Sequence, residues 1–287
     1  MTDRLYRFTF EQFAVRGAMV SLDASWRALV DGHDYAPPVR DYLGQTLAAA
    51  TMLSCIIKFK GSLILQLQGD GPLRTLVAQA TERRTIRGMA LAVEDVPDSG
   101  FAGTFGTGRL TMTAESPRGE RFQGIVVLQG ESIAQVLEAY FHQSEQLATR
   151  IWLAAGRHTA AGLLLQRLPG AQDDAEDWRR VCLLADTLTR EELLQQAPTQ
   201  ILRRLFHEEL IRLYEPEPVA FRCSCSRERI DSVLRLMGQR EVESIVAEQG
   251  AVEANCEFCN ARYRLDAVDV AGLFADSPPL APSESQH

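Results

Sequence analysis

The stretch FRCSCSRERIDSVLRLMGQREVESIVAEQGAVEANCEFCN, residues 221–260, decides how this 287-residue chain is organised. It holds four of the six cysteines in two close pairs, Cys223 with Cys225 and Cys256 with Cys259, separated by thirty residues. A structural zinc site needs four soft donors at the corners of a tetrahedron, and two close pairs joined by a folded insert supply them. The spacing therefore predicts one zinc ion held by four thiolates.

The insert and the residues after it predict a small α+β zinc-binding domain over residues 221–274. Apolar residues at helical spacing indicate two helices, which end at Gly238 and Gly250. Arg262–Leu265 is typical of a short strand, and Asp266 can cap a last helix. Residues 275–287 are rich in Pro and Ser, and we expect a disordered tail. The apolar faces of the two helices consist of Ile230, Val233, Leu234 and Met237 and of Val242, Ile245 and Val246.

On the N-terminal side, residues 1–170 predict an α/β (α+β) domain with a mixed sheet and helices. The Ala-rich stretch from Asp41 to Ile57 is long and apolar enough for a buried helix. Apolar and polar residues alternate around Leu65, Met112 and Val126, which indicates three strands. Because helical and strand-like segments are interleaved, we expect both kinds of element in one domain.

Residues 171–220, called the linker segment below, carry eleven acidic residues and six arginines, a local charge of −5. Thr189 and Glu192 are spaced as a capping box, and Thr199 can cap a second helix. Pro216 and Pro218 end that helix. An amphipathic helix of this length is marginal alone, so we expect a metastable helical linker. Its predicted apolar face, which needs a neighbouring surface, consists of Leu202, Leu205, Phe206, Leu210 and Leu213.

The composition argues against several classes of protein. The formal net charge is −8, and Lys58 and Lys60 are the only lysines, so a nucleic-acid partner is not expected. The chain shows no signal peptide and no apolar run long enough to span a membrane, so we expect a soluble, cytoplasmic protein with no membrane contact. Nucleotide-binding and nucleophile motifs are absent, and His33, His142, His158 and His207 are scattered, so neither a nucleotide site nor an enzyme is expected.

In a reducing cytoplasm the cysteines need a role other than stable disulfides. Cys55 and Cys182 lie in apolar helical stretches and are predicted to be inert core thiols. The C-x-C pair is one residue shorter than the usual zinc knuckle, and a disulfide across so short a loop is strained and labile. Arg222, Arg227 and Arg229 flank this pair and favour thiolate over thiol. These residues leave two interpretations equally open, a redox-sensitive zinc site and an ordinary zinc-stapled module.

The energetics show how a redox-sensitive site would work. A module of about fifty residues has too little core to be secure alone, whereas thiolate coordination contributes on the order of 10 kcal/mol to its folding. Oxidation of the thiolates to disulfides would expel the zinc and remove that contribution. The module is then expected to unfold, and the linker segment would lose any packing that it takes from the module.

Phe221–Arg229 together with Cys256–Cys259 resembles the redox switch of the 33 kDa chaperonin family, the redox-regulated holdases also called heat shock protein 33. One departure is Asn260, where members often carry glycine; asparagine also tolerates a left-handed turn. The resemblance extends over nearly the whole chain, with matches at FAVRG (13–17), LQLQGDGP (65–72), YFHQSEQ (140–146), AGLLLQ (161–166) and LFHEE (205–209).

The resemblance implies a specific mode of action. The reduced protein would hold zinc with the four thiolates and be inactive. Peroxide with heat, or hypochlorous acid, would form disulfides between Cys223 and Cys225 and between Cys256 and Cys259, with loss of zinc and unfolding of the zinc domain and linker. The exposed surfaces would then bind unfolding client proteins without ATP, with the protein as a homodimer. The implied fold, an α/β domain, a helical linker and a small zinc domain, agrees with the divisions drawn above.

Two alternatives belong to other classes. A nucleic-acid or ribosome-associated protein with a structural zinc module is disfavoured by the net charge of −8 and by the acidic linker segment. A thiol oxidoreductase that uses the C-x-x-C pair would need a strand-to-helix setting for that motif, and it would not need four cysteines on one metal. Our leading hypothesis is therefore a redox-activated chaperone.

Overall fold

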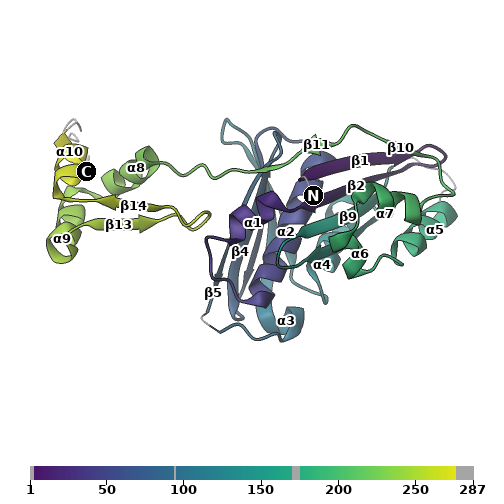
Figure 1. The fold of residues 1–287 in the computed structure, drawn as a ribbon, viewed down its shortest axis with the longest axis horizontal. Helices are drawn as coiled ribbons and strands as arrows, with labels where there is room; N and C mark the ends of the chain where they lie inside the picture. Colours follow the sequence, from purple (N-terminus) through teal and green to yellow (C-terminus); the bar gives the residue numbers. More distant parts are fainter. Residues whose placement is uncertain (1–2, 94, 170–174, 276–287) are drawn as a thin grey trace, which may run out of the picture. The chain divides into compact units, whose positions relative to one another are not determined.

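The computed structural model describes residues 3–93, 95–169 and 175–275 (Figure 1). The chain divides into two units, residues 1–222 and 223–287, each with a hydrophobic core of its own. The expected fold class, a mixed α/β domain and a small α+β domain, is confirmed. Of the expected disordered tail, only Ala275 is described, and it ends a helix. Within the described ranges, the helices are too short or too polar to cross a membrane.

Two sheets form the first unit. The first sheet has the strand order β10-β1-β2-β9-β8, with β11 also paired to β1, and all its pairings are antiparallel. The second has the order β12-β5-β4-β3-β6-β7, and only β12 pairs in parallel. The first sheet comprises β1 (Arg4–Phe10), β2 (Val15–Leu22), β8 (Thr149–Ala155), β9 (Ala160–Arg167), β10 (Ile211–Leu213) and β11 (Glu217–Pro218). The second comprises β3 (Ser62–Gly69), β4 (Leu73–Thr81), β5 (Thr85–Ala92), β6 (Gly108–Glu115), β7 (Arg121–Val127) and β12 (Ala220–Phe221). The strands predicted around Leu65, Met112 and Val126 are β3, β6 and β7.

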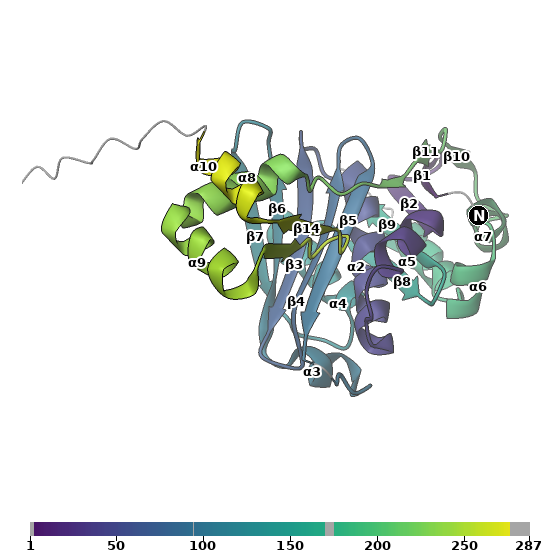
Figure 2. The same ribbon diagram turned by 60° about the vertical axis from the view of Figure 1, so that its left-hand side comes forward.

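Helix α2 (Pro37–Ile56) packs against strands of both sheets, as the predicted buried helix (Figure 2). Its hydroxyl side chains are satisfied within the helix: Thr46 donates to the Tyr42 carbonyl at 2.8 Å and Thr51 to the Leu47 carbonyl at 2.7 Å. The remaining faces of the helix are therefore free to bury apolar groups. The other helices of this part are α1 (Ala24–Val30), α3 (Gly100–Phe105), α4 (Ile133–Tyr140) and the π-helix η1 (Phe141–Glu145).

The described part of the linker segment belongs to the first unit and forms α5 (Ala175–Ala185), α6 (Arg190–Gln195) and α7 (Pro198–Leu205). These helices cover the face of the first sheet that α2 leaves open, where Leu202, Leu205 and Phe206 are buried. The predicted capping box of Thr189 and Glu192 is present. The other members of this second core include Phe8, Phe10, Met19, Leu163 and Leu165 of the sheet.

Two expectations about this segment were wrong. The cap of α7 is Ala197, with Pro198 at the first helical position, so Thr199 lies inside the helix. The helix ends at Leu205, and the chain then turns to pair β10 with the edge of β1. The helical period therefore does not reach Leu210 or Leu213, and both side chains are exposed, by 58% and 42%.

The second unit places three helices around a two-stranded antiparallel sheet. The predicted helices are α8 (Arg227–Met237), which ends at Gly238, and α9 (Gln239–Gln249), which ends at Gly250. The predicted strand is β14 (Arg262–Leu265), paired with β13 (Val252–Asn255). Asp266 accepts hydrogen bonds from the first turn of α10 (Ala267–Ala275). Among the described residues, the hydrophobic core of this unit is a cluster of six buried side chains, Leu234, Val242, Val252, Leu265, Val270 and Leu273.

Candidate metal centre

The two cysteine pairs lie on short, well-defined turns. Cys223 and Cys225 occupy the segment between β12 and α8, directly before Ser226, whose hydroxyl accepts from the Arg229 amide as the cap of α8. The second pair lies in the loop of the β13–β14 hairpin, where the Asn260 amide donates to the Cys256 carbonyl at 2.7 Å. Asn260 has φ 54°, the left-handed conformation expected of it. Both turns thus fix the backbone next to the sulfurs.

The four sulfur atoms converge on one point. All lie within 4.8 Å of one another, and all four residues are partly buried. The Cys223 and Cys256 sulfurs are 3.6 Å apart, and those of Cys225 and Cys259 are 3.3 Å apart. A tetrahedral ion with metal–sulfur bonds of about 2.3 Å requires sulfurs roughly 3.8 Å apart. The cluster can therefore hold one metal ion, and no second such group occurs in the ranges that the structure describes.

The thiols of the cluster differ in pKa. A hydrogen bond from the Tyr263 hydroxyl lowers the pKa of Cys225 to about 7, and the same bond raises the pKa of Tyr263 to about 12. Burial raises the pKa of Cys223 and of Cys259. Without a cation, thiolate is thus favoured at Cys225 and disfavoured at two of the other positions. A bound divalent cation would compensate the buried charges, because coordination favours the thiolate form.

Tyr263 is a residue that the sequence analysis missed. It lies on β14, four residues beyond Cys259, and the sequence offers no signal that its hydroxyl faces the sulfurs. Two of the three arginines suggested for that role, Arg227 and Arg229, have other partners. Arg227 pairs with Asp231 at 3.0 Å and Asp269 at 3.1 Å, and Arg229 donates to the Ser224 hydroxyl. Thiolate at Cys225 is therefore favoured mainly by a tyrosine.

The remaining two cysteines lie apart from the cluster. Cys182 is buried in α5, where desolvation raises its pKa to about 12. Cys55 is half-buried near the end of α2, and desolvation raises its pKa to about 11. Both remain protonated at neutral pH, as expected of inert thiols.

Comparisons with known proteins agree with this arrangement. A family model described as Hsp33 protein matches residues 3–266. The chain is 50% identical over 285 residues to the 33 kDa chaperonin of Nitrosococcus oceani, covering 99% of each chain. It is 44% identical over 293 residues to the 33 kDa chaperonin of Azotobacter vinelandii, again covering 99% of each. The solved structure of the 33 kDa chaperonin of Thermotoga maritima, at 24% identity, superposes with a TM-score of 0.84 and covers 96% of this chain and 98% of that one. That structure supports the fold.

Proposed function

The chain belongs to the Hsp33 family of 33 kDa chaperonins, and from this premise we propose that it is a redox-regulated, ATP-independent holdase. The observation that carries the proposal is the convergence of four thiols on one metal-sized centre in a unit with a very small core. In the reduced state Cys223, Cys225, Cys256 and Cys259 hold one zinc ion as thiolates, and the protein is inactive.

Oxidation removes the donors in pairs. Cys223 and Cys225 form one disulfide, and Cys256 and Cys259 form the other. In each case two thiolates give two electrons to a peroxide, the S–S bond forms, the O–O bond breaks, and two protons from solvent complete two water molecules. Disulfide sulfurs are poor zinc ligands, so the zinc ion is released. Because coordination contributes on the order of 10 kcal/mol to such a module, the second unit then unfolds.

The linker segment connects this unfolding to client binding. Cys223 lies two residues after Phe221, the last residue of β12, and β12 consists of only two residues on the edge of β5. We expect this short pairing to fray when the residues after β12 unfold. Upstream, α5 to α7 cover Phe8, Phe10 and Met19 of the first sheet. Release of these helices uncovers an apolar sheet face, which is a suitable surface for unfolding proteins.

We propose further that residues 171–220 act as the metastable linker and that the oxidised form is a homodimer. We also propose that the protein works in the cytoplasm, where reducing conditions keep the cysteines unoxidised and able to bind zinc. Its partners would be unfolding client proteins, and it would need neither nucleotide nor nucleic acid. It would act by binding, with no catalysed reaction.

Three parallel measurements test the proposal: zinc release, free thiols, and light scattering of a heat-denaturing client, each before and after peroxide treatment. We expect the oxidised, zinc-free form to suppress aggregation and the reduced form to be inactive. Equal suppression by both forms would refute redox control. Salt-sensitive binding to RNA with no effect on the client would instead identify a nucleic-acid protein.

A further inference from the structure

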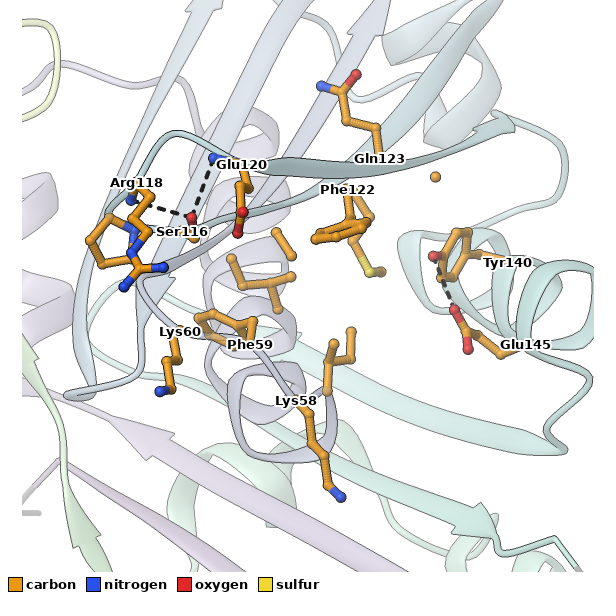
Figure 3. A pocket seen from close by; sticks show the side chains of 16 residues that line it. Lys58, Phe59, Lys60, Ser116, Arg118, Glu120, Phe122, Gln123, Tyr140 and Glu145 are labelled. Atoms are coloured by element: carbon orange, nitrogen blue, oxygen red, sulfur yellow. Dashed lines mark hydrogen bonds between the residues drawn. The ribbon is translucent and has the colours of Figure 1, made fainter.

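A concave site lies in the first unit. It is a cavity of about 670 Å³, within the size range of small-molecule sites. Its floor is apolar and consists of Leu63 on β3 and Met112 and Ala114 on β6. The rings of Phe59 and Phe122 stand at its walls (Figure 3). The cavity therefore offers hydrocarbon contact from several sides.

The cavity exists because α2 ends too early to cover this corner of the second sheet. The strand register places Phe122 opposite Ala114, and Ala114 opposite Leu63, on the face that packs against α2. Since α2 stops at Ile56, the Phe122 side chain has no cover and is 75% exposed. An aromatic side chain that is exposed on the core-facing side of a strand lacks an apolar partner within the chain, and such exposed apolar surface often binds a ligand.

Tyr140 closes the cavity on the opposite side. A side chain at Gly124 would collide with it, because a Cβ there would lie 2.3 Å from the Tyr140 ring. The ring thus occupies the space over β7 that a larger residue would fill. Its hydroxyl donates to Glu145 at 3.5 Å, so this carboxylate is held at the Tyr140 side (Figure 3).

The charge around the cavity is positive and asymmetric. Lys58, Lys60 and Arg118 line it together with two carboxylates, Glu120 and Glu145, so the lining keeps a net positive charge. These lysines are the only two in a chain of net charge −8. Arg118 and Lys60 lie on the side away from Tyr140 and Glu145 (Figure 3). In the part of the chain that the structure describes, none of the three cations forms an ion pair with a carboxylate. Cationic heads on aliphatic stems, beside an apolar floor, suit a ligand with an anionic head and a hydrocarbon chain.

We propose that this cavity binds a single-chain aliphatic carboxylate, a fatty-acid anion. Its chain lies along Leu63, Met112 and Ala114 between the two phenylalanine rings, and its carboxylate meets Lys58, Lys60 and Arg118. A compact anion such as phosphate would leave the apolar floor unused, and a neutral hydrocarbon would leave the cations unpaired. The inference is independent of the holdase function, because it uses no residue of the metal centre or the linker segment.

Calorimetric titration of the reduced, zinc-loaded full-length protein tests the ligand class. The probe is dodecanoate below its micelle concentration, and we expect one molecule to bind per chain. Octanoate is four methylenes shorter and should bind up to about 250-fold more weakly, because each methylene buried is worth about fourfold in affinity. Dodecyltrimethylammonium should not bind. Equal affinity for dodecanol would overturn the proposal, because the cations would then have no role. Stoichiometry well above one would overturn it too.

Variants test the location. Lys58→Met and Lys60→Met keep an apolar stem at exposed positions and remove only the charges, and the double variant should bind dodecanoate about tenfold more weakly. Arg83→Met removes a charge from an exposed turn outside the cavity and should leave the affinity unchanged. Ala114→Leu fills the cavity and should abolish binding with an unchanged melting temperature. Wild-type affinity in the lysine double variant would refute the site.

A last measurement distinguishes a free fatty acid from the anionic surface of a lipid bilayer. Phosphatidylglycerol vesicles carry anionic head groups in a bilayer, and we expect the protein to stay in the supernatant when they are sedimented. Cosedimentation that disappears in the Lys58→Met and Lys60→Met double variant would identify the cations as a lipid-surface contact and overturn the free acid as ligand.

Discussion

Substitution of Phe206 by alanine should separate linker release from metal loss. Phe206 is 2% exposed, and its ring meets Phe10 edge-on at 5.2 Å and Phe8 at 6.2 Å between centroids. It directly follows α7, so its ring helps to hold that helix on the first sheet. The four clustered cysteines belong to the other unit. The substitution should therefore weaken the linker segment with zinc still bound.

The magnitude follows from the burial. Phe→Ala in a well-packed core costs about 3–5 kcal/mol, and aromatic pairs add specific contact energy to the side chain that is lost. Because about 1.4 kcal/mol changes an equilibrium tenfold, the lower limit of 3 kcal/mol raises the population with a released linker roughly 100-fold. We expect measurable holdase activity in reductant, where the proposed function predicts an inactive wild-type protein.

The assay is light scattering of a denaturing client, with zinc content and hydrogen exchange of α7 measured on the same sample. Leu210→Ala is the matched control, because Leu210 is 58% exposed in the same segment and its loss should change nothing. Fast exchange in α7 together with full zinc content and no holdase activity would refute the linker segment as a control element.

Three further outcomes are expected. Cys256→Ser should remove one of four donors, so the second unit should lose its zinc and the helical circular dichroism of α8 to α10 without oxidant; a folded, zinc-loaded variant would contradict the four-thiolate centre. Arg84→Ala should lower the peroxide concentration needed for half-activation. The Arg84 side chain pairs with Glu217 of β11 at 2.7 Å and donates to the Ser54 carbonyl of α2 at 2.9 Å, so it holds β11 on the domain. Arg83→Ala, at the neighbouring exposed position, should leave the peroxide concentration unchanged. The first unit should lose stability as pH rises from about 8.5, where the thiol of Cys182 ionises in the unfolded chain, toward about 12, where it ionises in the folded protein. The protonated thiol contributes its full stability only below the lower pKa, because above it the unfolded chain gains from ionisation. Denaturant titrations of Cys182→Ala should therefore show a smaller loss of stability at alkaline pH.

The sequence was most informative where one face of an element is buried and the other is not. In β3, Leu63, Leu65 and Leu67 are buried and their neighbours are only partly so, and the alternation predicted the strand. Strands β2 and β9 gave no such signal, because α2 covers one face of their sheet and α5 to α7 cover the other. A strand buried on both faces reads as a continuous apolar run, which periodicity cannot distinguish from a helix.

The metal centre was predictable for a different reason. Structural zinc sites use few residue types, mainly cysteine and histidine, so the close spacing of the cysteine pairs identified Cys223, Cys225, Cys256 and Cys259 as candidates. The tuning of the centre was not predictable, because the hydrogen bond from Tyr263 depends on how a hairpin strand lies beside the first pair. The extent of α7 was also missed, since the pairing of β10 with β1 is a long-range contact that overrides the local apolar pattern at Leu210 and Leu213.

The packing of the linker segment implies that metal loss alone does not complete activation. Helices α6 and α7 have six and eight residues, too few to be stable in isolation, so their stability comes from the first sheet. Those contacts survive when the second unit unfolds, because Phe206, Leu202 and Leu205 pack on residues of the first unit. The linker joins the second unit through the two-residue strand β12, which itself pairs with β5 of the first unit. Release of the helices therefore requires a second destabilising influence on the first unit, such as heat. The protein would then bind clients only when oxidation and protein unfolding occur together, which is the condition under which unfolded clients accumulate.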